Sequence, residues 1–304
     1  MTLVVVGSVG IDTVETPFGR VEDVVGGSAV YFSLAASLFT EVRVAANVGH
    51  DFPAHPWEAL RARGADLSGL KVYPDQPTFR WTGRYQGDMG SAETLSTELN
   101  LLAVPPVVPA DYRGAPFVFL ANMGADVQIR MLDELDGATV FADTMNLWIR
   151  TQPEELREVL RRVDGLILND GEARMLTGET NLIAAGSELL KMGPEIVVVK
   201  KGEHGAFLFA PEFHFALPAY PTTRVVDPTG AGDSFAGGFV GFLASAGEVD
   251  KHRLRQAMAY GTVAASLTVE KFSTQALEEA SREDLDRRYA ELREFVRLEQ
   301  RERV

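Results

Sequence analysis

The sequence predicts an α/β fold, a doubly wound and mostly parallel sheet flanked by helices. Short runs of β-branched and other apolar residues alternate with longer segments of helical periodicity along almost the whole chain. This alternation is typical of parallel strands joined by right-handed helical crossovers. The chain has 304 residues, of which 46% are hydrophobic, so a single α/β domain over residues 1–304 can bury a substantial core.

Each expected element follows from this alternation. The chain opens on an apolar, β-branched run with no basic residues before it, which predicts a first strand rather than a signal peptide. The predicted strands are residues 3–7, 42–46, 117–120, 138–142, 165–168, 195–199, 206–209 and 224–226. The predicted helices are residues 27–38, 56–63, 126–135, 153–162, 170–177, 182–192, 233–246, 251–269 and 282–301. Ser281 and Asp284 have capping-box spacing at the start of the last helix.

Two stretches interrupt the alternation. Residues 13–25 follow the first strand without a helix, and residues 73–103 contain a strand-like alternation followed by a polar run. We expect these two insertions to form a small β-sheet that projects from the main domain. A pair of separate surface hairpins is the alternative.

The most informative segment is Asp-Pro-Thr-Gly-Ala-Gly-Asp at residues 227–233, which leads into an apolar helix of small residues. Its glycines allow backbone conformations that are closed to other residues. The amides of Gly230, Ala231 and Gly232 would point together from the positive end of that helix, which favours an anion. Asp233 makes sense there if it accepts a proton from a hydroxyl while the amides stabilise a phosphoryl group in transfer.

The composition argues against several other classes of protein. The net charge is −14, and such an acidic surface would repel nucleic-acid backbones, although a local amide site can still bind a nucleotide. The absence of cysteine excludes disulfides and thiolate metal sites. The longest apolar helix, about residues 235–246, is too short and glycine-rich to cross a membrane. We therefore expect a cytoplasmic protein with neither nucleic acid nor membrane as partner.

The 227–233 motif closely resembles the C-terminal motif of the ribokinase-like (PfkB) carbohydrate kinase family. The resemblance implies a ribokinase-like fold in which Asp233 is the catalytic base and the amides of Gly230, Ala231 and Gly232 form an anion hole. It also implies that the small sheet is a lid over the sugar site. Such lids are sometimes shared between subunits, which makes a homodimer through the lid one option.

Polar residues follow the predicted strands, at the edge of a parallel sheet where ligands bind. They are Asp12, Asn47, Asn122, Asp143, Asn169, Lys200, Lys201 and Asp227. Helix capping could account for about half of them, including Asn122 and Asp143. It does not account for Asp12, which no clear helix follows.

The resemblance also suggests which residues bind the acceptor. Asp12 with Gly26 and Gly27 is similar to the family's substrate motif, in which the Asp takes two sugar hydroxyls and the double glycine lets the substrate approach the backbone. A carboxylate that accepts two hydroxyls suits a vicinal diol. Asn47 and Trp81 are further candidates for binding the acceptor.

The nucleotide and its ions are assigned in the same way. Asn169 and Glu172 match the family's Asn-x-x-Glu motif, which organises Mg²⁺ and its waters, and oxygen ligands of this kind suit Mg²⁺. The alternative for Glu172 is an ordinary carboxylate at a helix start. The candidates for binding ATP are Lys200, Gly202, Thr229 and Gly232. Asp227 and its turn could offer oxygens to K⁺.

We therefore expect an ATP-dependent kinase that phosphorylates a hydroxyl of a small carbohydrate. Ser28 and Tyr31 stand where many family members have a Lys and an Asn that contact the sugar, which puts ribose or fructose in doubt. A nucleoside kinase is the first alternative, because Tyr31, Phe79 and Trp81 could stack on a base, and a cyclitol kinase is another. A catalytically silent ligand sensor is the non-enzyme alternative, although a pure binder gains nothing from Asp233.

Overall fold

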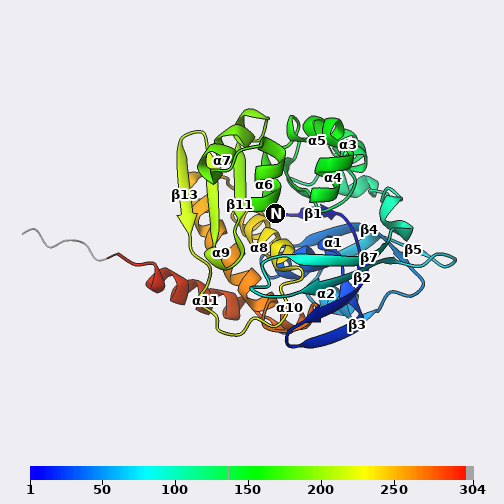
Figure 1. Cartoon of the computed structure of the whole chain (residues 1–304). Helices are drawn as coiled ribbons and strands as arrows, with labels where there is room; N and C mark the ends of the chain where they lie inside the picture. Colours follow the sequence, from blue (N-terminus) through cyan, green and yellow to red (C-terminus); the bar gives the residue numbers. More distant parts are fainter. Residues whose placement is uncertain (136, 299–304) are drawn as a thin grey trace, which may run out of the picture.

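The computed structural model of the chain describes residues 1–135 and 137–298 and contains a main sheet of nine strands (Figure 1). The strands are β1 (Leu3–Val6), β4 (Val42–Gly49), β5 (Asp66–Tyr73), β8 (Phe117–Leu120), β9 (Thr139–Asp143), β10 (Gly165–Asn169), β11 (Ile196–Lys200), β12 (Ala206–Ala210) and β13 (Phe213–Leu217). Their order is β13-β12-β11-β10-β9-β8-β1-β4-β5. All neighbouring strands from β11 to β5 are parallel, whereas β12 pairs antiparallel with both of its neighbours, β11 and β13. The predicted mostly parallel sheet is confirmed.

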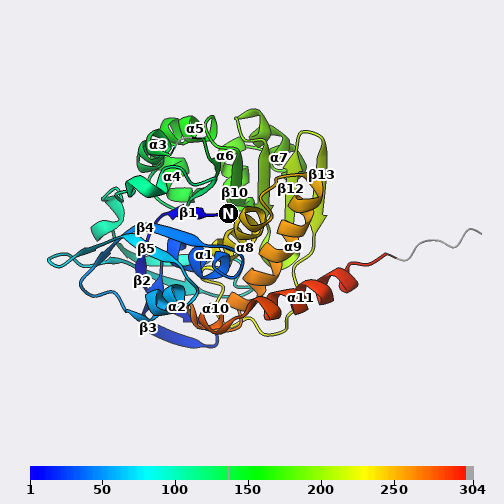
Figure 2. The ribbon, with the colours of Figure 1, turned by 180° about the vertical axis from the view of Figure 1, so that it is seen from behind.

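Helices cover both faces of this sheet. One layer contains α3 (Ala125–Glu134), α4 (Asn146–Thr151), α5 (Pro153–Leu160), α6 (Asp170–Thr177) and α7 (Leu182–Lys191). The other contains α1 (Ser28–Ala36), α2 (His55–Ala62), α8 (Ala231–Ala246), α9 (Lys251–Thr268), α10 (Gln275–Glu279) and α11 (Arg282–Phe295). Figures 1 and 2 show the two layers above and below the sheet. None of the helices among the described residues combines the length and apolar character needed to span a lipid bilayer.

The burial of β1 explains why its sequence is continuously apolar. Leu3 and Val5 face the layer that contains α1 and α8, while Val4 and Val6 face the layer that contains α3 and α5. A strand with both faces covered cannot alternate between apolar and polar residues.

The helix α8 packs closely against α1. A Cβ on Gly237 of α8 would lie 2.3 Å from the carbonyl oxygen of Phe32 in α1. Close packing against α1 therefore fixes the helix that carries the 227–233 motif.

The two insertions form one small sheet. Its strands are β2 (Gly10–Thr16), β3 (Gly19–Gly26), β6 (Phe79–Tyr85) and β7 (Ala92–Glu98), in the order β3-β2-β6-β7. The sheet lies beside α1 and α2, at the lower right of Figure 1. Because β2 and β6 come from different insertions and pair in parallel, separate surface hairpins are excluded. We call this sheet the lid.

Several element predictions were wrong or incomplete. No strand forms at residues 224–226, because the amides of Val226 and Asp227 both donate to the carbonyl of Val269, at 2.7 and 3.2 Å, instead of to a neighbouring strand. The strands β5 and β13 and the helices α4 and α10 were not predicted. The predicted helix 282–301 ends at Phe295, and its last three residues lie outside the described part of the chain.

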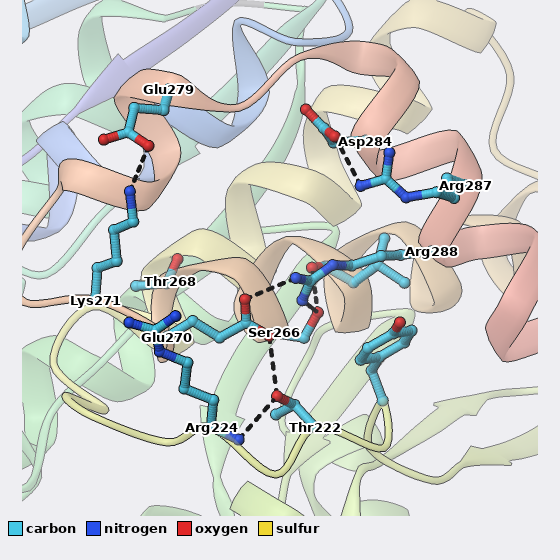
Figure 3. Close-up of polar contacts among 12 residues, drawn as sticks. Thr222, Arg224, Ser266, Thr268, Glu270, Lys271, Glu279, Asp284, Arg287 and Arg288 are labelled. Atoms are coloured by element: carbon cyan, nitrogen blue, oxygen red, sulfur yellow. Dashed lines mark hydrogen bonds and ion pairs between the residues drawn. The ribbon is translucent and has the colours of Figure 1, made fainter.

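A polar network fixes the segment that leads to the motif (Figure 3). On α11, the Arg288 guanidinium donates to the Ser266 hydroxyl at 2.9 Å and to the Glu270 carboxylate at 2.7 Å. The other carboxylate oxygen of Glu270 accepts from the Thr222 hydroxyl at 2.9 Å. The last long helix is thus tied both to the end of α9 and to the loop that enters the motif.

Candidate active site

The 227–233 motif forms the turn from which α8 begins. Gly230 has a φ of +73°, in the left-handed region, and a Cβ on it would lie 2.4 Å from the Tyr31 ring. The Asp227 carboxylate accepts from the amides of Thr229 at 2.9 Å and Ser273 at 3.0 Å, which fixes the turn from within. The Ala231 amide donates to the Pro228 carbonyl at 3.2 Å. Of the three amides assigned to the anion hole, those of Gly230 and Gly232 are therefore the better candidates.

Lys200 ends β11 directly beside this turn. A Cβ on Gly232 would lie 2.8 Å from the Lys200 ammonium nitrogen. Loss of water contact raises the pKa of Asp233 to about 6, while the positive charge of Lys200 and the backbone amide of Asp233 itself oppose the rise. A carboxylate with this pKa is mostly ionised at neutral pH and is a better proton acceptor than a surface aspartate. A nucleotide role for Lys200 stays a prediction, and its position beside Gly232 is compatible with it.

The sequence places Asp143 at the ligand-binding edge of the sheet but gives it no role, and the structure makes it a candidate site residue. It ends β9, is 5% exposed, and its Oδ1 has no hydrogen-bond partner. Burial raises the pKa of Asp143 well above its usual range, the negative charge of Asp233 adds to the rise, and Lys200 opposes it. Asp143 was interpreted as a helix cap, but the next helix is preceded by Met145. Its place at a strand end was the only signal in the sequence.

Asn169 and Glu172 form a capping box at the start of α6. Asn169 Oδ1 accepts from the Glu172 amide, and Glu172 Oε2 accepts from the Asn169 amide, both at 2.8 Å. The capping alternative therefore explains part of this motif. Glu172 is nevertheless buried close to Lys200 and Asp233, and this burial raises its pKa.

The carboxylates around Asp233 fit a Mg²⁺ ion that arrives with a nucleotide. Within the part of the chain that the structure describes, no three His, Asp or Glu side chains form a complete metal cage. Mg²⁺ bound to substrate phosphates needs only one or two protein carboxylates, because phosphates and waters complete its coordination. The unpartnered Oδ1 of Asp143 and the second carboxylate oxygen of Glu172 are suitable ligands.

Asp12 lies on β2 in a buried position, with 5% exposure. Burial raises the pKa of Asp12 to about 8, and the negative charges of Asp227 and Asp233 contribute to the rise. A Cβ on Gly26 would lie 2.1 Å from the Asp12 carboxylate, and one on Gly27, whose φ is +96°, would lie 2.5 Å from Val9 Cα. The double glycine therefore makes room for the chain's own Asp12 and backbone. Close approach of a substrate to these glycines stays a prediction.

Two aromatic residues of the lid lie near Asp12. Trp81 pairs with Asp12 in the β2–β6 register, so both side chains are on the same face of the lid. The Trp81 indole donates to the Thr94 hydroxyl at 3.1 Å, and a Cβ on Gly83 would lie 2.0 Å from its ring. The ring therefore lies over Gly83, and its N–H group reaches β7.

Tyr85 ends the same strand and was not predicted as a site residue. Its hydroxyl accepts from the Thr229 hydroxyl at 3.4 Å, which joins the lid to the motif turn. Burial raises the pKa of Tyr85, and the charges of Asp227, Asp12 and Asp233 add to the rise. The lid strand therefore reaches the carboxylates of the site.

Two predicted residues lie apart from this cluster. Gly202 begins an exposed 3₁₀ turn after β11, with a φ of +55°, and a Cβ on it would meet no heavy atom within 4 Å. The neighbouring Lys201 ammonium lies 4.8 Å from the centre of the Phe207 ring, outside the cluster. Asn47 lines a separate small pocket at the end of β4. A nucleotide role for Gly202 stays a prediction.

The pH dependence of the reaction provides a test of the electrostatic interaction between Lys200 and Asp233. Protonated Asp233 cannot accept a proton, so we expect kcat/KM to fall as the pH drops below about 6. Lys200→Met removes the positive charge that lowers the pKa of Asp233, so the acidic limb should move to higher pH. Rate profiles of both proteins against pH would check this, and an acidic limb at the same pH in both would contradict the electrostatic interaction.

This fold and site define a phosphotransferase that acts on a hydroxyl group. The model of the pfkB family carbohydrate kinase matches residues 2–280, and the chain belongs to this family. The cytidine kinase of Thermococcus kodakarensis is 30% identical over 247 residues, which cover 79% of this chain and 87% of that protein. The inositol 3-kinase of Oryza sativa subsp. japonica is 27% identical, over 79% of this chain and 62% of that protein. The acceptor is thus a sugar or a nucleoside.

Solved structures confirm the fold. The nucleoside kinase of Burkholderia thailandensis in complex with ADP-inosine has a TM-score of 0.78 at 20% identity, over 95% of both chains. The aminoimidazole riboside kinase of Salmonella enterica, complexed with aminoimidazole riboside and an ATP analogue, has a TM-score of 0.74 at 20% identity. That match covers 95% of this chain and 100% of the other.

Proposed function

We propose that this chain is an ATP-dependent nucleoside kinase, which transfers the γ-phosphoryl group of ATP to a hydroxyl of the nucleoside's sugar. The observation that carries this choice of acceptor is the Trp81 indole, which lies over Gly83 on the face of the lid that also carries Asp12. A flat aromatic surface suits a base, and a nearby carboxylate suits the vicinal hydroxyls of a ribose. The similarity to a cytidine kinase supports the same acceptor.

In this proposal, Asp233 accepts the proton of the acceptor hydroxyl while the oxygen attacks the γ-phosphorus and ADP leaves. The amides of Gly230 and Gly232 stabilise the charge on the transferred group. Hydrogen bonds from two sugar hydroxyls favour the ionised form of Asp12, which accepts both and so orients the third hydroxyl. Lys200 keeps Asp233 ionised and would meet the phosphates from the opposite side of the turn.

Asp143 and Glu172, with Asn169 through water, would hold Mg²⁺ beside the phosphates. When bound, the ion neutralises the charge of the triphosphate. K⁺ is a further candidate ion at the turn of Asp227. Both carboxylate oxygens of Asp227 already accept backbone amides, so carbonyl oxygens of the turn would have to supply the ligands.

A small carbohydrate is the second candidate acceptor, because Asp12 can bind any vicinal diol, including that of a cyclitol. The lid could also join two copies of the chain. Its edge strand β7 is exposed, and Leu95 and Leu99 on and beside it are 43% and 50% exposed. The presence of Asp233 beside the predicted anion hole argues against a catalytically silent ligand sensor, because a protein that only binds its ligand gains nothing from a base there.

A panel of acceptors tests the proposed function. We expect the purified protein to phosphorylate nucleosides faster than free sugars or inositols with ATP. Trp81→Ala should lower kcat/KM for nucleosides by about tenfold or more, because stacking on a base is worth about 1–3 kcal/mol, and should affect ribose much less. Phe18→Ala is the matched control, since Phe18 is a lid aromatic that is 63% exposed. Phosphorylation of sugars but of no nucleoside would reject the proposal.

A further inference from the structure

A small pocket lies at the carboxyl ends of β1, β4 and β8. These strands are neighbours at the point where the chain's strand order reverses, because β4 and β8 flank β1 on opposite sides. Crevices at such points are the usual ligand sites of open parallel sheets. The pocket is lined by Gly7, Ser8, Val9, Asn47, Leu101, Leu102, Val104, Pro106, Met123 and Val127. Most of the lining side chains are apolar, although polar atoms make up nearly half of the exposed lining, and Asn47 supplies its side-chain amide.

In the side-chain amide of Asn47, the nitrogen has a hydrogen-bond partner and the oxygen has none. Its Nδ2 donates to the carbonyl of Val104 at 2.7 Å, whereas its Oδ1 is buried without a partner. Because a carbonyl can only accept, the amide cannot be turned around without bringing two oxygens together. The residue is 6% exposed, and a buried acceptor without a partner is costly. A hydrogen-bond donor on a ligand would satisfy it.

Two short connections join the pocket to the acceptor site. Val9 lines the pocket, and Asp12 follows it by three residues, about 10 Å along an extended chain. The 3₁₀ turn Asn100–Ala103, which carries Leu101, is tied to the lid because Asn100 Nδ2 donates to the carbonyl of Thr78 at 2.8 Å. For a ribose held at Asp12, the base would have to lie between β6 and the pocket to reach Asn47.

We infer that Asn47 selects nucleosides whose base carries an exocyclic amino group. This inference rests on the proposed nucleoside kinase activity. The pocket, with a volume of about 20 Å³, has room for one water-sized group. The amino group enters it and donates to Asn47 Oδ1, while the ring stays at the opening of the pocket. A carbonyl at the same position of the base would face Asn47 Oδ1, which is also an acceptor, so neither oxygen would receive a hydrogen bond. The specificity of the enzyme is thus set by an oxygen whose orientation Val104 fixes.

Two pairs of nucleosides test this inference, because cytidine differs from uridine, and adenosine from inosine, by an amino group in place of a carbonyl. We expect kcat/KM for the amino member to exceed that of its partner by about tenfold or more in the wild type. Asn47→Leu, which has similar size but no acceptor, should bring the ratio close to one. The kcat/KM ratio is measured on the wild-type protein, so it tests the inference even if Asn47→Leu does not fold.

Asn122→Leu is the matched control. Asn122 also follows a strand of this edge, but its Oδ1 already accepts from the Trp148 indole at 2.8 Å and its Nδ2 contacts Met145 Sδ at 3.5 Å. In Asn122→Leu, the ratio of kcat/KM for the amino nucleoside to kcat/KM for its partner should equal that of the wild type. Nucleoside phosphorylation with a wild-type ratio near one, or a ratio unchanged in folded Asn47→Leu, would overturn this inference alone. Phosphorylation of no nucleoside would overturn the proposed function and this inference with it.

Discussion

Asp233→Asn is expected to lower kcat by about two to four orders of magnitude, the usual contribution of a general base. The amide that replaces the carboxylate has the same shape but cannot accept the proton of the acceptor hydroxyl. The affinity for ATP should stay close to that of the wild type, because the amides of the turn are unchanged. Steady-state rates and calorimetric titration with ATP measure the two effects separately.

Thermal stability distinguishes this result from damage to the fold. The pKa of Asp233 in the folded protein, about 6, lies above its ordinary value of 3.8. The folded state therefore binds this proton more tightly than the unfolded state, and the carboxylate costs stability as the pH rises from about 4 through 6. Asn does not ionise, so at neutral pH the variant should melt at the same temperature as the wild type or higher.

Asp126→Asn is the matched control for the base. Asp126 is also an acidic residue in the first turn of a helix, α3, and is exposed. Its replacement should leave kcat unchanged. A loss of less than tenfold in Asp233→Asn would reject Asp233 as the base.

The main sheet was predictable because most of its strands are buried on both faces and read as continuous apolar runs. Two strands near the edges were missed. In β5, from Asp66 to Tyr73, most side chains are only partly buried, and polar residues interrupt the apolar pattern. In β13, polar His214 stands between two aromatic residues. The strand expected at residues 224–226 was wrong because Val269 takes the amides that a strand would have used.

The candidate site was predictable where a motif is local in sequence. The 227–233 turn carries its own geometry, so Asp233 and Gly230 could be identified from the sequence alone. Asp143 and Tyr85 could not, because what makes each one a site residue is a neighbour far away in the chain. Asp143 depends on the parallel order of β9, β10 and β11, and Tyr85 on the docking of the lid against Thr229.

Gly230→Ala is expected to lower kcat by about 100- to 1000-fold, the scale for the loss of one amide that stabilises a developing negative charge. The native φ of +73° disfavours any residue with a Cβ, and that Cβ would lie 2.4 Å from the Tyr31 ring. Because Tyr31 is fully buried in α1, its ring cannot move aside. The turn must shift instead, and its amides move with it.

Gly178→Ala separates the cost of the left-handed backbone from the loss of the anion hole. Gly178 ends α6 with a φ of +76°, and a Cβ there would meet no heavy atom within 4 Å. Both variants should lose about 1–2 kcal/mol of stability from placing alanine in the left-handed region, with a further loss in Gly230→Ala from the contact with Tyr31. Only Gly230→Ala should lose activity. Near-wild-type kcat in a destabilised Gly230→Ala protein would show that the geometry of this turn does not stabilise the transferred phosphoryl group.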